Sequence, residues 1–426
     1  MNRDESIELW QQGKDAWNAW ANIMLAEREV LEQDGLWQVY DHGIPKGFQG
    51  QNSETREWIQ KANVNFSCSC FRPQIWPGGK SNGGKQIVPK QDYVNFSGFI
   101  FPYHANFNDS IFDCSYTQFH KAQFIGGYAN FADTQFIGAD VAFTRTQFIG
   151  GYAYFGGAQF SGGNVLFNSA KFDHDAFFSV AQFEKPVNFS EATFKKSADF
   201  SSITSEKSFN LTDTKFAQVP GFTETAFHAP PVLDDIKIAD PLECRMWNWR
   251  GKNEPRHGGM SPFKIANAPT DSRKYRALSK MADEAKDYQN EMEFFAREQR
   301  CRRFWNDRPF GKGAGRFWFG LAYEKFSDFG RSFLRPFIGW LATLAIFTSY
   351  YWSQAKGTGH IWDSLYLSLR HGLVISGLTK NGHMTTLLTK MYCTDIPAFA
   401  FMLQPFISAI WIFLLLLALR NQFKIR

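Results

Sequence analysis

The residues best suited by type and spacing to bind an ion lie in a glycine-rich segment near the C-terminus. Its three glycines are five residues apart, and a glycine lets backbone carbonyl groups approach a bound ion closely. Two hydroxyl residues lie among the glycines. The candidate pore loop consists of Gly372, Ser376, Gly377, Thr379 and Gly382.

A second polar candidate lies within an apolar stretch, where Gln404 is followed by Pro405. A buried amide there suggests a hydrogen bond between helices and hence a contact between copies of the chain, so we expect a homo-oligomer. The alternative is that the pair is only a tolerated kink in one helix.

Other motifs give no support to an enzyme, a cofactor or a metal site. Gly79-x4-Gly84-Lys85 nearly matches a phosphate-binding loop, but Gln86 replaces the Ser or Thr that would hold Mg²⁺. The pair Cys68 and Cys70 has no second pair with which to bind zinc. We find no nucleophile with a base and an orienting group, and expect no catalysis.

Two uncharged stretches indicate that the candidate pore loop and Gln404 belong to a membrane region. Residues 336–355 and 396–419 are each long enough to cross a hydrocarbon core of about 30 Å. They predict a two-helix transmembrane hairpin, and the alternative of two buried core helices is disfavoured because the rest of the chain is too small to surround them. The connecting loop, 356–395, is expected to be extracytoplasmic and includes a candidate re-entrant helix at 361–376.

Flanking charge predicts the orientation of this hairpin. Residues 297–335 carry ten Lys or Arg and four acids, and the tail 420–426 adds three positive charges, whereas 356–395 carry four basic and two acidic residues. Positive charge favours the cytoplasmic side, so we expect both termini in the cytoplasm of a bacterial cell and the helices in its inner membrane. The N-terminal residues include no apolar run, so we expect no cleavable signal peptide. Residues 305–335 mix aromatic and basic side chains, as in a helix lying on anionic lipid; a nucleic-acid interface is the weaker interpretation.

The middle of the chain contains phenylalanine pairs five residues apart, which step forward by 12 residues and then, from Phe167, by 11. This period fits neither an α-helix nor a flat strand. It fits a chain that turns a corner every five residues and stacks its coils, which is a β-solenoid. The expected core residues include Phe107, Phe112, Phe119, Phe124, Phe131, Phe136, Phe143, Phe148, Phe155, Phe160, Phe167 and Phe172.

The segments "ANFNDSIF", "AQFIGGYANFADTQF" and "EATFKKSADF" resemble the pentapeptide-repeat family. The resemblance implies a right-handed quadrilateral β-helix over residues 96–229. Two pairs make one coil, so a coil takes 22 to 24 residues, more than is usual in the family, and "IGGYA" and "SGGNV" hold the extra residues at wider corners.

The remaining segments are expected to connect these parts. Residues 1–35 predict an amphipathic helix that caps the first coil, and 36–95 a first repeat with an inserted loop. An irregular linker, 230–270, precedes a helical connector, 271–304, formed by one long helix or a pair.

The C-terminal part resembles a two-helix channel pore, in which a short helix and a filter lie between the spans. It departs from that family because no T-V-G-Y-G filter is present, and Arg370, His371, Lys380 and His383 add positive charge. A conducting loop would therefore select ions weakly or tolerate anions.

We expect a membrane-anchored scaffold or sensor whose cytoplasmic β-helix binds a protein partner, with membrane lipids as a further partner. The alternative is an oligomeric ion channel or pore-forming effector gated by the β-helix. A lesser alternative is a DNA mimic that modulates a topoisomerase. Residues 92–227 carry 13 acids and eight bases, which is too mild and too interspersed for a row of phosphates, and we expect no bound nucleic acid.

Overall fold

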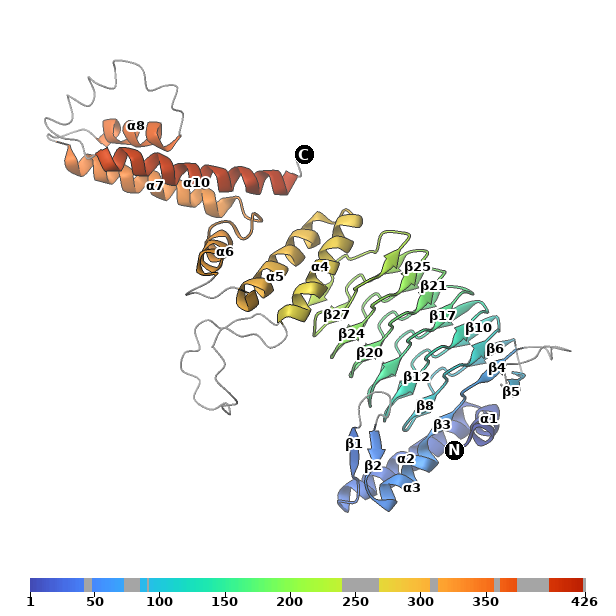
Figure 1. The fold of residues 1–426 in the computed structure, drawn as a ribbon. Helices are drawn as coiled ribbons and strands as arrows, with labels where there is room; N and C mark the ends of the chain where they lie inside the picture. The colour runs from blue at the N-terminus through green and yellow to red at the C-terminus, as the bar shows by residue number, and fades with distance from the viewer. Residues whose placement is uncertain are drawn as a thin grey trace. The chain divides into compact units, whose positions relative to one another are not determined.

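The computed structural model describes residues 1–41, 48–72, 85–89, 92–239, 268–306, 313–355, 361–373 and 398–423. They form two compact units, Met1–Cys301 and Arg302–Arg426, which we describe separately. The first unit is a parallel β-solenoid of about six turns with helices at both ends, and the second unit is helical (Figure 1).

Strands of the solenoid fall into four parallel sheets, so each turn has four sides. Sheet I contains β6 (Tyr93–Asn95), β10 (Tyr116–Gln118), β14 (Asp140–Ala142), β18 (Val165–Leu166), β22 (Val187–Asn188) and β26 (Phe209–Asn210). Sheet II contains β7 (Ile100–Phe101), β11 (Gln123–Phe124), β15 (Gln147–Phe148), β19 (Lys171–Phe172), β23 (Thr193–Phe194), β27 (Lys215–Phe216) and β29 (Lys237–Ile238).

The other two sheets close the coil. Sheet III contains β3 (Val64–Asn65), β8 (Ala105–Asn106), β12 (Ala129–Asn130), β16 (Ala153–Tyr154), β20 (Ala176–Phe177) and β24 (Ala198–Asp199). Sheet IV contains β5 (Lys85–Ile87), β4 (Ser69–Phe71), β9 (Ile111–Phe112), β13 (Gln135–Phe136), β17 (Gln159–Phe160), β21 (Gln182–Phe183), β25 (Thr204–Ser205) and β28 (Ala226–Phe227).

Phenylalanine rings stack in columns along the solenoid. The ring of Phe143 lies 4.8 Å from those of Phe119 and Phe167, nearly parallel to both, while the ring of Phe131 in the next column meets it edge-on at 5.3 Å. Stacking and edge-to-face pairs each add about 0.5–1.5 kcal/mol to the gain from burial. The twelve phenylalanines named above are at most 2% exposed.

Two inward threonines between the rings have their hydroxyl groups satisfied. The hydroxyl of Thr134 donates to the Phe107 carbonyl at 2.8 Å, and that of Thr146 donates to the Phe119 carbonyl at 2.7 Å. A hydroxyl can thus occupy the core without an unpaired donor.

The glycine-rich corners of the coil explain why the repeat changes from 12 to 11 residues. In the longer coils, glycines stack on the backbone of the previous coil: a Cβ added to Gly162 would lie 1.3 Å from the Gly138 carbonyl oxygen, and one added to Gly138 would lie 1.8 Å from that of Cys114. Later coils omit this residue and use ordinary side chains at the corner, as in "FDHDAF".

The solenoid extends beyond the predicted boundary at residue 229. Leu233 and Ile238 are buried five residues apart, and β29 pairs with β27. The prediction ended early because aliphatic residues replace phenylalanine in this last half coil. Residues 240–267 of the predicted linker lie outside the described residues.

Two helices, and not the single helix predicted for residues 1–35, begin the N-terminal cap. Helices α1 (Arg3–Gln12) and α2 (Lys14–Gln33) separate at Gly13, whose φ of +100° favours glycine. The Trp17 indole donates to the Ile100 carbonyl at 2.8 Å, and the Asn18 amide bonds both Gly98 and Ile100. These contacts cover the edge of the first coil.

A third helix and a small hairpin complete this cap. Helix α3 (Ser53–Ala62) follows the antiparallel strands β1 (Val39–Asp41) and β2 (Phe48–Gly50). Trp58 packs against Trp37 and Tyr103.

A pair of helices covers the last coil. Helices α4 (Ala268–Glu284) and α5 (Tyr288–Asn306) occupy the predicted connector. Tyr275 and Leu278 of α4 are fully buried against the core. Lys274 donates to the Val219 carbonyl at 2.9 Å, so exposed strand ends are satisfied at this end too.

The second unit contains α6 (Ala314–Ser327), α7 (Leu334–Gln354), α8 (Ile361–Gly372) and α10 (Ala398–Phe423). Among the described residues, one segment, Met402–Asn421 of α10, is long and apolar enough to cross a membrane, with a mean hydropathy of 2.3. The predicted two-span hairpin is therefore supported for one helix only. Helix α7 does not meet this test, and its sequence contains Arg335 near its start and a polar and aromatic end, TSYYWSQ.

We expect Gly162→Ala to destabilise the solenoid by several kcal/mol, because its methyl group would overlap the backbone of the neighbouring coil. Hydrogen exchange of the flanking strands and thermal unfolding would measure the loss. Gly156→Ala is the matched control, because its Cβ would lie an ordinary 3.5 Å from the Ser179 carbonyl oxygen. Equal stability of the two variants would contradict the stacked-corner geometry.

Candidate functional site

A buried amide joins three helices of the second unit. The side chain of Gln404 in α10 accepts a hydrogen bond from the Tyr351 hydroxyl of α7 at 2.9 Å. Its nitrogen donates to the carbonyl and the hydroxyl oxygens of Ser368 in α8, both at 2.8 Å. All three side chains are at most 1% exposed, so the amide holds the three helices together away from solvent.

Further hydrogen bonds hold α8 against α7. The Ser368 hydroxyl donates to the Leu344 carbonyl at 2.9 Å, and the Trp340 indole donates to the Gly372 carbonyl at 3.0 Å. A Cβ on Gly372 would lie 2.3 Å from a methyl carbon of Leu344. A larger residue would require the Leu344 side chain to move, so α8 packs tightly on α7.

Helices α7 and α10 make their own close contact. The Trp411 indole donates to the Thr343 hydroxyl at 3.0 Å. A Cβ on Gly339 would lie 2.6 Å from the Trp411 ring. Small residues at a helix contact are typical of packing within a bilayer, where they let the backbones approach.

The second unit has a largely apolar exterior and an interior that contains polar as well as apolar side chains. Its buried side chains include Thr343, Ser364, Ser368, Gln404 and Ser408, whereas Met402 of α10 is 78% exposed and Ile346 of α7 is 66% exposed. A water-soluble bundle has the opposite arrangement. Among the described helices, α10 alone is long and apolar enough to cross a membrane.

Two hydroxyl groups inside this interior have no hydrogen-bond partner in the described part of the chain. They belong to Ser364 of α8 and Ser408 of α10, both fully buried. The Ser408 oxygen would lie 3.7 Å from a Cβ on Gly372. Neutral hydroxyl, amide and carbonyl oxygens are groups that can solvate a monovalent ion or a water molecule, but they supply no general base.

The sequence-predicted site residues divide into two groups. Gly372 ends α8, whereas Ser376, Gly377, Thr379 and Gly382 of the candidate pore loop lie outside the described residues.

Gln404 makes the predicted bonds between helices, but their partners belong to the same chain, so these bonds require no second copy. Pro405 lies inside α10. The sequence did not lead us to Tyr351 and Ser368 as partners of Gln404. The signal that could have identified them is a polar residue on the buried face of each helix.

The outer face of sheet III carries a group of aromatic side chains, which we call the aromatic face: Tyr128, Tyr152, Tyr154 and Phe177. They are partly exposed. The ring of Tyr154 stacks on that of Phe177 at 5.2 Å, and the ring of Tyr152 lies 5.9 Å from that of Tyr154. Outward positions on sheet IV carry glutamine instead, at Gln135, Gln159 and Gln182.

Sequence reasoning did not single out the aromatic face. Tyr128 and Tyr152 both precede an inward alanine, and the register pairs Ala129 with Ala153. The period-two alternation within "GYAN" and "GYAY" was the available signal, because side chains on either side of an inward residue point outward.

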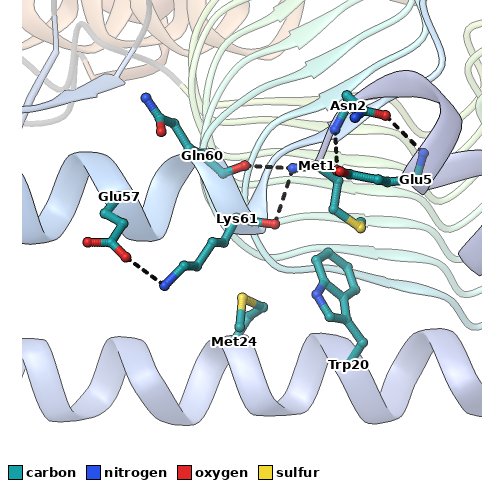
Figure 2. Close-up of a pocket in the computed structure, with 8 residues that line it drawn as sticks. All are labelled: Met1, Asn2, Glu5, Trp20, Met24, Glu57, Gln60 and Lys61. Carbon is teal, nitrogen blue, oxygen red and sulfur yellow. Dashed lines mark hydrogen bonds and ion pairs between the residues drawn. The ribbon is translucent and has the colours of Figure 1, made fainter.

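A hollow of about 590 Å³ lies at the N-terminal cap. Its lining residues come from α1 and the two residues before it, from α2 and from α3 (Figure 2). The amino group of Met1 donates to the Gln60 carbonyl at 2.6 Å and the Lys61 carbonyl at 3.3 Å, and Lys61 pairs with Glu57 at 2.8 Å. Burial lowers the pKa of the amino group. These contacts cap the end of α3 and indicate a structural role.

Two buried thiols of the solenoid are poor nucleophiles. Burial raises the pKa of Cys70, and it raises that of Cys114 to about 12. Both therefore stay protonated at neutral pH. The segment that nearly matches a phosphate-binding loop is also an unsuitable site. Lys85 begins strand β5, whereas such a loop is followed by a helix.

Comparison of the chain with protein-family models, with curated proteins and with solved structures found no match. The functional argument therefore rests on the residues and the geometry described above.

We expect Tyr351→Phe and Gln404→Leu each to destabilise the helical unit by about 1 kcal/mol, and the double variant to lose less than the sum. The reason is that both changes remove the Tyr351–Gln404 hydrogen bond, and Gln404→Leu also removes the two bonds to Ser368. Thermal unfolding in detergent would measure the three losses. Phe406→Leu, at a 67% exposed position of the same helix, is the control. Strictly additive losses would show that the two side chains do not interact.

Proposed function

We propose that this chain is a membrane-anchored scaffold of the pentapeptide-repeat type whose β-helix binds a protein partner. The aromatic face is the observation that carries the proposal. Aromatic side chains are enriched in protein interfaces, where they supply most of the binding energy at few positions. The proposal includes no catalytic step and no cofactor.

The membrane anchor in this proposal consists of α7 and α10, with α10 as the better supported span. Helix α7 shares the Thr343–Trp411 and Tyr351–Gln404 hydrogen bonds with α10, so both helices occupy the same medium. Its outward side chains, among them Ile338 and Ile346, are apolar. The charge distribution favours cytoplasmic termini in a bacterial inner membrane.

Helix α6 would lie at the membrane surface. Phe319 and Trp318 are 76% and 52% exposed, and the helix carries Arg316 and Lys325. Arg303 pairs with Glu324 at 2.6 Å on its protected side. Exposed aromatic and basic side chains on one helix suit the headgroup region of an anionic bilayer.

A repeated flat surface explains why a solenoid suits this role. Each turn adds outward side chains in register with those of the previous turn, because the coils pair strand to strand. The aromatic face spans β12, β16 and β20 in this way. Its aromatic side chains can therefore contact an extended area of a partner protein.

The proposal is tested by site-specific photo-crosslinking in membranes of the native host. We expect a photoreactive phenylalanine analogue at Tyr152 or Phe177 to give a discrete adduct with another protein. The same analogue at Gln159, on the outer face of sheet IV, is the matched control and should give none. Tyr154→Ser should reduce the adduct from Phe177 about tenfold, since an interface aromatic contributes more than about 1 kcal/mol.

Three results would reject the scaffold: no adduct at Tyr152 and Phe177, an equal adduct at Gln159, or recovery of the protein in the aqueous fraction without detergent.

The position of α8 favours a second candidate function, that of an oligomeric ion channel. This short helix packs against two long helices that also contact each other, and it is bonded to both through Ser368. Short helices held at membrane depth occur where they border a water-filled cavity. The hydroxyls of Ser364 and Ser408, which have no hydrogen-bond partner among the described residues, are compatible with such a cavity.

Ion flux into proteoliposomes tests the channel. We expect salt-dependent flux that Ser408→Leu reduces at least about tenfold, because an apolar side chain would obstruct a hydrated path. Phe413→Leu, at a 63% exposed position, serves as control and should conduct normally. A wild-type protein that is reconstituted, folded and silent would exclude this function.

A further inference from the structure

A cavity of about 580 Å³ lies near the C-terminal end of the solenoid, between sheet II and α5. Strands β23, β27 and β29 form one wall, and Glu293 and Arg297 of α5 form the other. All of these residues belong to the first unit. The size falls within the range of small-molecule sites, about 300–1,000 Å³.

The hollow arises from a change of side-chain size along one outward column of sheet II. The residues that follow β19, β23, β27 and β29 are Asp173, Lys195, Ala217 and Ala239, and their backbones are bonded coil to coil. The last two are alanines, and their short side chains leave a space between the sheet and α5. Arg297 bridges the space by donating to the Ile238 carbonyl at 2.8 Å.

The lining of this cavity is basic. Lys195, Lys215, Lys237 and Arg297 contribute cations, and Glu293 contributes the single carboxylate of the described lining. Lys215 and Lys237 occupy the same register position on adjacent strands, so their stems start from neighbouring points of the ladder.

The cations differ in how far they are neutralised. Lys195 pairs with Asp173 at 2.8 Å, Lys237 with Asp213 at 3.4 Å, and Arg297 with Glu293 at 2.5 Å. Lys215 forms no ion pair with any described residue. The cavity therefore retains positive charge even when every internal pair is formed.

We propose that this cavity binds a soluble organic phosphate. A phosphate offers several acceptor oxygens and close to two negative charges, which suits lysine point charges and an arginine fork on opposite walls. Ile236, Ala217 and Ala239 form an apolar patch beside these cations, and this patch accommodates the organic part. The ligand would join the last coils to α5, because its phosphate contacts side chains of both.

This site is independent of the partner-binding role, which uses sheet III. Loss of phosphate binding would leave the photo-crosslinking result unchanged, and the reverse holds too. The two ideas therefore fail separately.

The test is calorimetric titration of the full chain in detergent at low salt with AMP, inorganic phosphate and adenosine. AMP should bind saturably and more tightly than inorganic phosphate, and adenosine should not bind. Lys215→Ala and Lys237→Ala should each weaken AMP binding at least about tenfold, the loss expected for one charge-assisted contact.

Two further variants complete the test. Lys196→Ala removes an exposed lysine that is next to Lys195 in sequence but absent from the lining, and it should leave AMP affinity unchanged within about twofold. Ala217→Leu fills the hollow without changing charge and should abolish binding while the melting temperature is kept. The proposal is overturned if AMP fails to bind, if adenosine binds equally well, or if Ala217→Leu binds AMP normally.

Discussion

The solenoid depends along most of its length on one repeated contact, the stacking of a phenylalanine ring on its equivalent in the next coil. At 4.8 Å the ring separation equals the spacing of hydrogen-bonded strands. Ring stacking and backbone pairing can therefore be satisfied together. A residue added within a strand would break both, which is why the extra residue of the longer coils lies at a glycine corner.

This in-register stacking also determines what the outer surface can do. Inward positions have no freedom, because each must fill the space between two rings. Outward positions are free, and the chain uses them differently on each side: aromatic side chains on sheet III, glutamines on sheet IV, and lysines beside alanines at the end of sheet II. The proposed sites follow from these outward columns and not from the core.

The helical unit is held together in a different way from the solenoid. Its core is held by a few directional hydrogen bonds, around Gln404 and between Thr343 and Trp411, while its large apolar side chains face outward. In water such a unit would expose its apolar surface, and in lipid the same surface is stable. The polar contacts then decide which helices pack together.

The sequence alone determined the solenoid, because a five-residue spacing of large inward side chains is compatible with few other folds. It also indicated an apolar span in α10. It did not reveal the aliphatic last half coil, the break at Gly13, or the partners of Gln404. Those depend on which side chains meet across long sequence separations, and no local pattern encodes that. The aromatic face and the basic cavity are likewise properties of the tertiary structure, since residues about 22 to 24 positions apart become neighbours only when the coils stack.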